Sequence, residues 1–228
     1  MEIIKPSVEI ISDMSEEAIR EAMLKLEAAG RTCYKSEAKN PECDPEITDG
    51  FIGRIIGRQH TSVIEHHSIT VKFICDRGVT HELVRHRLCS FSQESSRYCN
   101  YSKKGMQFIK PPWVSDKVLG EWNFLDMLAL TQDEEGLPSP DFEWMCQMEK
   151  AEEAYNILID DGWKPEQARS VLPNSLKTEI VVTANLRQWR EVLRQRTAKA
   201  AHPQIREIMD TLLEYFVEKM PVIFGDLV

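Results

Sequence analysis

The segment ITVKFIC, residues Ile69–Cys75, is the clearest secondary-structure signal in the sequence. Apolar side chains at its odd-numbered positions alternate with Thr70 and Lys72, so the segment is predicted to be a β-strand with one buried face. Further strands are predicted at residues 2–11, 106–110 and 178–184. Apolar repeats at helical spacing predict helices elsewhere. These are expected at about residues 13–30, 45–57, 80–87, 142–159, 165–172, 186–198 and 203–219.

The order of these elements decides the predicted fold class. Strands and helices do not alternate regularly, which favours an α+β fold with a mostly antiparallel sheet flanked by helices over a doubly wound sheet. The 228 residues are enough for one large core, and a single domain over residues 1–228 is expected. The stripe Trp144, Met148, Ala151 and Tyr155 is expected to be core packing. Residues 113–140 give only helical hints, near 118–130, before an acidic break.

Charge is distributed unevenly along the chain. The net charge is −9, which argues against general affinity for nucleic acid. Residues 77–104 nevertheless carry a net +4 and residues 186–206 a net +5, so the remainder carries −18. Two basic islands in an acidic chain predict a local pocket for anions such as phosphates. Two solvated helix faces are the alternative explanation.

The sequence also bears on location and redox state. No apolar run approaches the roughly 20 residues that cross a bilayer, and the N-terminal MEIIKPSVEI does not resemble a secretory signal. A cytoplasmic protein without a membrane span is therefore expected. Six cysteines are scattered and none forms a C-x-x-C pair, which fits reduced thiols better than a disulfide framework or a zinc site.

The sharpest chemical feature is Arg85-His86-Arg87, followed after seven residues by Ser95. On the helix predicted from near Thr80, side chains two positions apart point about 200° from each other. Each arginine would then serve a different anionic ligand, since the guanidinium fork suits phosphate and carbonyl oxygens. The polar segment 88–101 is predicted to be a loop that adds hydrogen-bond donors. An anionic-ligand site is indicated, and a surface helix with a polar loop is the alternative.

The run RHRLCSFSQESSRY, Arg85–Tyr98, resembles the R-H-R-x7-S motif of flavin-dependent thymidylate synthases. Three other stretches resemble that family in the same order, and four ordered matches are more specific than a lone R-H-R. They cover most of the chain from residue 60 onward. The stretches are HTSVIEH (His60–His66), ARSVLP (Ala168–Pro173), and NLRQWREVLRQR (Asn185–Arg196) followed by AHPQIREI.

The resemblance implies two sets of ligand contacts. FAD is expected to contact Ser62, Arg85, His86, Arg87, Gln93, Asn185, Arg187 and Glu191. The substrate dUMP is expected to be held by Glu82, Leu83, Val84, Arg85, Gln93, Glu94, Ser95, Ser96, Arg97, Arg169 and Arg196.

The resemblance also implies a reaction and an assembly. NADPH reduces FAD, methylenetetrahydrofolate donates the one-carbon unit, and dUMP becomes dTMP. Active sites are expected at the subunit junctions of a homotetramer. The catalytic candidates are Arg196, which would polarise the uracil ring and favour loss of the N3 proton, together with Ser95 and His60. His60 and Tyr98 are expected near the folate or the flavin.

Three positions depart from the family pattern. Gln93 stands where relatives often carry Glu, Glu191 where an amide is common, and Glu82 in place of a Gln. All three are expected ligand contacts, so the sequence does not determine the geometry of the flavin and dUMP sites at these positions.

Several residues of the sequence point to other chemistries. Ser95 has no evident base partner, which favours ligand hydrogen bonding over a nucleophilic role. Cys89 is flanked by basic residues that would lower its pKa, and a cysteine-dependent methylase would need such a thiol. A non-enzymatic nucleotide- or RNA-binding module is the rival function, and it predicts salt-sensitive binding and no colour. No metal site is expected, because the spacing of His60, His66, His67, His81 and His86 with Glu65 matches no metal-binding motif.

Overall fold

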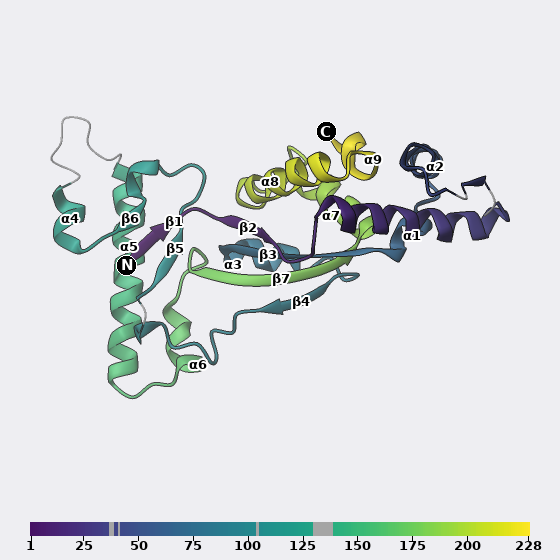
Figure 1. The fold of residues 1–228 in the computed structure, drawn as a ribbon. Coiled ribbons are helices and arrows are strands. Elements are labelled where there is room, and N and C mark those ends of the chain that lie inside the picture. Colours follow the sequence, from purple (N-terminus) through teal and green to yellow (C-terminus); the bar gives the residue numbers. More distant parts are fainter. Residues whose placement is uncertain (37–38, 41, 104, 130–138) are drawn as a thin grey trace. The chain divides into compact units, whose positions relative to one another are not determined.

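The computed structural model describes residues 1–36, 39–40, 42–103, 105–129 and 139–228. Within it the chain forms two compact units (Figure 1). Unit 1 comprises Met1–Ser7, Phe73–Arg85 and Ser92–Ile180, and unit 2 comprises Val8–Lys72, His86–Phe91 and Val181–Val228.

Four strands form one sheet in the order β2-β3-β7-β4. The predicted alternation is confirmed in its central strands, because every second residue of β3 and of β7 is buried. The Leu186 amide donates to the His67 carbonyl over 3.0 Å, and the Thr70 and Thr183 hydroxyls lie 2.9 Å apart. As one residue number rises the other falls, so β3 and β7 run antiparallel. The strands are β2 (Ser7–Ile10), β3 (Ser68–Asp76), β7 (Lys177–Asn185) and β4 (Ser90–Gln93).

Unit 1 contains a second sheet, in which β1 pairs parallel with β5 and antiparallel with β6. The long helix α5 (Ser139–Asp160) lies beside these strands (Figure 1). Met148 and Tyr155 of α5 are buried with Phe108, which confirms the core role predicted for that helix face. The remaining elements are β1 (Glu2–Ile4), α3 (Arg77–Leu83), η3 (Tyr101–Lys103), β5 (Gln107–Ile109), η4 (Asp116–Val118), β6 (Gly120–Glu121), α4 (Phe124–Ala129), α6 (Pro165–Ala168) and η5 (Arg169–Val171).

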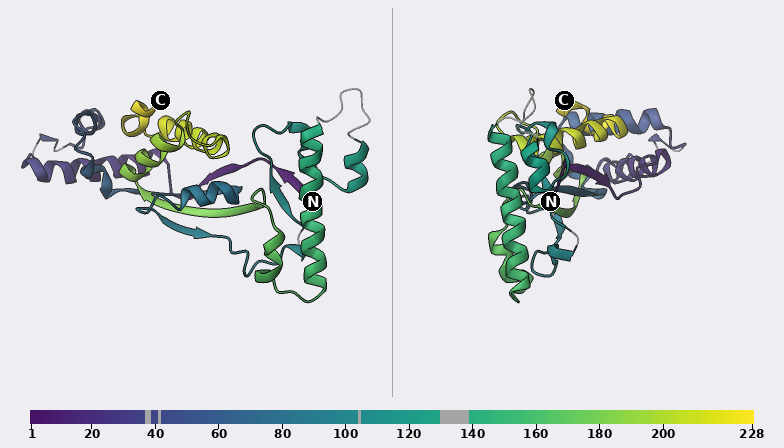
Figure 2. Two further views of the ribbon diagram at one scale, coloured as in Figure 1. Left: turned by 180° about the vertical axis from the view of Figure 1, so that it is seen from behind. Right: turned by 90° about the vertical axis from the view of Figure 1, so that its left-hand side faces the viewer.

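Unit 2 is mainly helical. The Trp189 indole donates to the Ile69 carbonyl over 2.9 Å, which fixes α7 to strand β3. Rings of Trp189, Phe216 and Phe224 pack in series, and both views of Figure 2 show α7, α8 and α9 together. The elements are α1 (Glu16–Tyr34), α2 (Pro45–Gly57), η2 (Thr61–His66), α7 (Leu186–Arg196), α8 (Pro203–Lys219), α9 (Pro221–Phe224) and η6 (Gly225–Leu227).

Three predicted element boundaries near the N-terminus are wrong. The helix predicted from about residue 13 begins only after Ser15, which caps α1, because the Ser15 hydroxyl accepts from the Ala18 amide. The predicted strand 2–11 is two strands interrupted near Pro6, which has no amide hydrogen. Helix α1 continues past Gly30 to Tyr34. A Cβ at Gly30 would lie 2.7 Å from the Phe51 ring, so this glycine permits close helix packing instead of ending the helix.

Two predictions around the R-H-R motif are also wrong. Asp76 caps α3, its carboxylate accepting from the Val79 amide, and the helix ends at Leu83. Arg85 and Arg87 therefore lie in the turn that follows α3. The angle of about 200° predicted between their side chains on a helix does not apply to them. The segment predicted to be a loop contains strand β4. The helical hints at 118–130 correspond in part to α4, and residues 130–138 lie outside the described residues.

Candidate functional site

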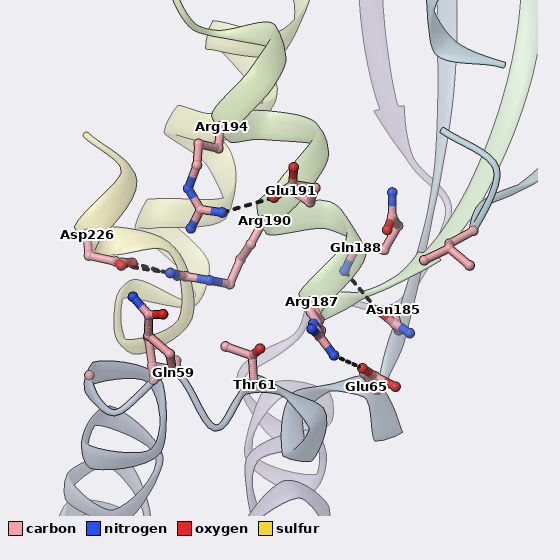
Figure 3. Close-up of a pocket in the computed structure, with 13 residues that line it drawn as sticks. Gln59, Thr61, Glu65, Asn185, Arg187, Gln188, Arg190, Glu191, Arg194 and Asp226 are labelled. Atoms are coloured by element: carbon pink, nitrogen blue, oxygen red, sulfur yellow. Dashed lines mark hydrogen bonds and ion pairs between the residues drawn. The ribbon is translucent and has the colours of Figure 1, made fainter. Parts of the chain in front are cut away.

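A hollow of about 860 Å³ opens in unit 2 beside the N-terminal end of α7 (Figure 3). We call it the α7 pocket. Its walls come from the end of α2, from η2, from α7 and from the C-terminal residues. The lining residues are Ile56, Gly57, Gln59, Thr61, Glu65, Leu88, Asn185, Arg187, Gln188, Arg190, Glu191, Arg194 and Asp226.

The sequence of α7 explains why its polar side chains face this hollow. Leu186, Trp189 and Leu193 recur at helical spacing and are buried, which leaves the arginines between them on the other faces. Asn185 begins the helix, its side-chain oxygen accepting from the Gln188 amide over 2.8 Å. The N-terminal end of an α-helix carries partial positive charge, so this end of the pocket favours anions.

Each arginine that lines the α7 pocket has a carboxylate partner (Figure 3). Arg187 lies 2.5 Å from Glu65, and Arg194 lies 3.0 Å from Glu191.

Arg190 differs from these two because its side chain is buried. It donates to both oxygens of Asp226, over 2.5 and 2.7 Å, and to the Ile223 carbonyl. The hydrogen bonds from Arg190 lower the pKa of the Asp226 carboxyl. Three cations and three anions thus balance the charge of this pocket.

His86 and Arg196 form a second arrangement in unit 2. Arg196 Nε donates to His86 Nε2 over 2.9 Å, which requires a neutral imidazole with its proton on Nδ1. His86 is only 7% exposed. Burial, and then the nearby Arg196 charge, lower its pKa, while Glu191 acts in the opposite direction. The neutral form of His86 therefore holds the guanidinium of Arg196 in place.

Unit 1 contains a smaller hollow of about 400 Å³, which we call the Ser96 pocket. Arg169 Nη1 donates to the hydroxyl of the buried Ser96 over 3.2 Å. Arg77 also lines it, and its Nη1 is buried with no hydrogen-bond partner among the described residues. An unsatisfied buried donor is costly, so this guanidinium is available to an incoming acceptor. The full lining is Arg77, Ser96, Glu166, Arg169, Ser170, Leu172 and Leu176.

Glu94 is held in a polar network of unit 1. It accepts from the Tyr101 hydroxyl over 2.7 Å and from Lys177 over 3.3 Å. Burial, together with the bond to Glu94, raises the pKa of Tyr101. Gln93 donates to the hydroxyls of Thr80 and Thr178 over 3.0 and 3.4 Å. Gln93 thus makes an amide contact that a glutamate there could not make in its ionised form.

The structure brings together some of the predicted site residues. Asn185, Arg187 and Glu191 line the α7 pocket, and Ser96 and Arg169 meet in the Ser96 pocket. Ser62 lies in η2 next to Thr61, which lines the α7 pocket.

Other predicted residues line neither pocket. Leu83 is buried, whereas Arg97 is exposed and lies over the Tyr98 ring at 5.4 Å. Ser95 accepts from the Arg97 amide over 3.4 Å. The other predicted residues are placed as follows. His60 lies at the start of η2 and Glu82 lies in α3. Val84, Arg85 and Arg87 are exposed in the turn that follows α3.

Sequence reasoning did not single out several residues of these pockets. Arg77, Arg190 and Arg194 lie within the two basic islands, 77–104 and 186–206, and no motif in the sequence distinguishes them from the other basic residues there. Glu65 and Asp226 pair with arginines 122 and 36 positions away in the chain. Pairing over such distances leaves no local pattern, and the only available signal was the excess of basic residues on α7.

The cysteine-dependent alternative finds no support in the structure. Burial raises the pKa of the Cys89 thiol to about 11, despite a hydrogen bond from Gln188, so the expected lowering of that pKa is wrong. Cys89 is therefore protonated near neutral pH and is a poor nucleophile. Within the described part of the chain, no group of three or more His, Cys, Asp or Glu side chains could hold a metal ion.

None of the described helices has the length and apolar character of a membrane span.

Comparisons with known proteins identify the family. Residues 16–222 match the family model described as thymidylate synthase complementing protein. Flavin-dependent thymidylate synthase of Mycobacterium tuberculosis (strain ATCC 25177 / H37Ra) is 32% identical over 204 residues, which are 88% of this chain and 78% of that protein. The enzyme of the same name from Corynebacterium diphtheriae is 32% identical over 202 residues, covering 88% and 77%.

A solved structure agrees with these relatives. The crystal structure of the UMP/dUMP methylase PolB from Streptomyces cacaoi, bound with 5-Br dUMP, superposes with a TM-score of 0.71 at 25% identity, covering 99% of this chain and 96% of that one. The chain therefore belongs to the family of flavin-dependent thymidylate synthases, and it is an enzyme.

Proposed function

We propose that this enzyme converts dUMP to dTMP, with FAD as the bound redox cofactor, methylenetetrahydrofolate as the one-carbon donor and NADPH as the reductant. The observation that carries the proposal is the α7 pocket, where three arginines and a helix N-terminus surround one hollow in a chain of this family. PolB, the structural neighbour, is named for methylation of UMP and dUMP, which supports a pyrimidine nucleotide as the substrate.

The α7 pocket fits FAD in size and in donor chemistry. Its volume of about 860 Å³ lies in the range of cofactor sites. Arginine forks suit a diphosphate, and the side-chain amides of Gln59, Asn185 and Gln188 can pair with the polar edge of a flavin ring. Bound FAD would supply the hydride chemistry, which protein side chains cannot. Ser62, Arg85, His86, Arg87 and Gln93 are proposed as further FAD contacts.

The Ser96 pocket is proposed to hold the phosphate of dUMP. Arg169 and Ser96 would donate to its oxygens, with Arg97 beside them and Arg77 as an additional donor. Charge-assisted hydrogen bonds of this type are about twice as strong as neutral ones. The other proposed dUMP contacts are Glu82, Leu83, Val84, Arg85, Gln93, Glu94, Ser95 and Arg196.

Arg196 is proposed to act on the uracil ring. Its cation would polarise the ring and favour loss of the N3 proton, while His86 orients it through the 2.9 Å hydrogen bond. Ser95 is proposed as a hydrogen-bonding contact and His60 as a residue near the folate. A homotetramer is proposed because the residues expected to bind FAD and dUMP extend beyond the lining of either pocket.

The experiment is anaerobic oxidation of the reduced flavoprotein by methylenetetrahydrofolate, with and without dUMP. The proposal predicts flavin oxidation coupled to dTMP formation only when dUMP is present, and UMP serves as the comparison substrate. Absence of FAD binding, together with salt-sensitive binding to RNA, would instead support the non-enzymatic alternative.

A further inference from the structure

A positively charged hollow lies in unit 2, outside both pockets described above. It measures about 260 Å³ and is formed by the end of α1, the segment after it and the last turn of α2. Its cations are Arg31, Lys39, Arg54 and Arg58, and none of the described residues that line it is a carboxylate. We call it the α2 pocket, and its remaining lining residues are Ser36, Phe51 and Ile55.

Arg31 forms the fixed wall of the α2 pocket. Its side chain is buried, forms an ion pair with Glu27 and lies over the Phe51 ring at 4.7 Å. It also donates to the Ser36 carbonyl over 3.3 Å. Glu27 in turn accepts from Asn40 and Thr48, so its carboxylate is fully engaged with this network. The Arg31 charge is thus compensated from the side of the pocket that faces the core.

The other three cations are not compensated within the part of the chain that the structure describes. Lys39, Arg54 and Arg58 have no ion-pair partner among the described residues. Arg54 and Arg58 lie at the C-terminal end of α2, where cations stabilise a helix, so their positions can be explained without a ligand. The end of the helix does not account for Lys39, which enters the same hollow from another segment. Three uncompensated cations around one hollow produce a positive potential that attracts an anion.

The size of the α2 pocket limits the anion. About 260 Å³ is below the usual range for whole nucleotides or drug-sized ligands. Two arginine forks and a lysine match the oxygens of a phosphate monoester. The α2 pocket therefore fits a single phosphoryl group, either free or attached to a larger molecule that extends out of the pocket.

The position of the α2 pocket indicates which larger molecule this is. Arg54, Ile55 and Arg58 line the α2 pocket, whereas Ile56, Gly57 and Gln59 line the α7 pocket. The two hollows thus share the last turn of α2, inside one compact unit. A molecule that delivers a hydride to a flavin in the α7 pocket can place a distant phosphate in the α2 pocket. NADPH carries such a phosphate monoester on its adenosine ribose, and NADH lacks it.

We propose that the α2 pocket binds the 2′-phosphate of NADPH and so selects NADPH over NADH. Arginine is the residue that accommodates this phosphate in other dinucleotide sites. The inference rests on the proposed flavin chemistry for its role in the reaction. Binding of the phosphate itself can be tested without it.

The kinetic test follows reduction of the bound flavin by NADPH and by NADH, under anaerobic conditions. In the double variant Arg54→Gln and Arg58→Gln, the KM for NADPH is expected to rise about tenfold or more, because two charge-assisted contacts are lost. The KM for NADH is expected to stay unchanged. Arg20→Gln, an exposed position on α1, is the matched control and should alter neither value. An unchanged preference for NADPH in the double variant, or equal use of both dinucleotides by the native enzyme, overturns the proposal.

A binding test separates this proposal from the proposed function. Calorimetry should show that the native protein binds adenosine 2′,5′-bisphosphate much more tightly than 5′-AMP. The double variant should no longer bind the bisphosphate. Inorganic phosphate binding as tightly as the bisphosphate would identify a free-phosphate site and overturn the assignment to NADPH. If the double variant raised the KM for methylenetetrahydrofolate and left the KM for NADPH unchanged, the assignment would also be overturned. Failure to form dTMP from chemically reduced flavin would contradict the proposed function but leave the result for the α2 pocket intact.

Discussion

The α7 pocket and the Ser96 pocket both contain arginines, but they differ in how that charge is balanced. In the α7 pocket, Arg187, Arg190 and Arg194 each pair with a carboxylate. In the Ser96 pocket, Arg77 and Arg169 share the lining with one acidic residue, and a buried nitrogen of Arg77 has no partner among the described residues.

This difference separates two kinds of recognition. A balanced pocket suits a large ligand with mixed polar groups, which exchanges with existing ion pairs and is oriented by them. A pocket with excess positive charge suits a compact dianion such as a nucleotide phosphate. We therefore expect changes in the Ser96 pocket to act on the nucleotide and changes in the α7 pocket to act on the cofactor.

The largest effect is expected at Arg196, which belongs to neither pocket lining. Arg196→Ala should lower the rate of dTMP formation by about 10²–10³-fold, the usual loss when a donor to a developing negative charge is removed. Quench-flow measurement of dTMP tests this, with circular dichroism to verify the fold. Normal turnover by a folded variant would refute the role assigned to Arg196.

The next largest effect is expected in the Ser96 pocket. Arg77→Gln and Arg169→Gln should each raise the KM for dUMP roughly 10- to 100-fold, because a hydrogen bond to a charged group contributes about 1.5–3 kcal/mol. The Kd for FAD should hardly change. Lys150→Gln, an exposed cation on α5, is the control. An equal change in the Kd for FAD would show that the two pockets do not divide recognition in this way.

An intermediate effect is expected from the protonation of His86. Neutral His86 accepts from Arg196 and protonated His86 cannot, so single-turnover rates should fall about tenfold as His86 becomes protonated. The pKa of His86 is lowered in the fold, so this loss should occur below the ordinary value of about 6.5.

The same pKa shift has a consequence for stability. The unfolded state binds the proton more readily, so His86 contributes stability above its unfolded pKa, and that contribution is lost as the pH falls through the folded value. His86→Gln retains an acceptor and should lose the acid limb from the pH–rate profile. An unchanged acid limb in this variant would assign it to another group.

The smallest effect is expected from the exposed pair in the α7 pocket. Glu65→Gln removes the partner of Arg187 and should tighten FAD binding by up to about fivefold, while Arg187→Gln should weaken it. The magnitude is small because exposed ion pairs contribute roughly 0–1 kcal/mol. Flavin fluorescence titration measures both. Weaker binding in Glu65→Gln would mean that the carboxylate itself contacts the cofactor.

Much of the fold was predictable because its signals are local. The alternation of Ile69 to Cys75 gave β3, and the bounds of α2 and α8 agree with the sequence prediction. The end of α3 and strand β4 were not predictable. Seven helical residues give a weak period, and the polar sequence SFSQ of β4 has no apolar alternation.

The candidate site was predictable in part, for a related reason. Asn185, Arg187 and Glu191 were expected from a contiguous motif, and they line one pocket. Glu65, Asp226 and Arg77 were not expected. Their roles depend on neighbours that only tertiary folding brings close, or on a nitrogen that folding leaves unpaired.

The central claim is that the α7 pocket binds the flavin and the Ser96 pocket binds the phosphate of the nucleotide. A crystal structure of the native enzyme with FAD and dUMP tests it most directly. We predict flavin in the α7 pocket and the dUMP phosphate against Ser96, Arg169 and Arg77. A complex in which dUMP lies away from the Ser96 pocket, or in which flavin lies away from the α7 pocket, would contradict the account.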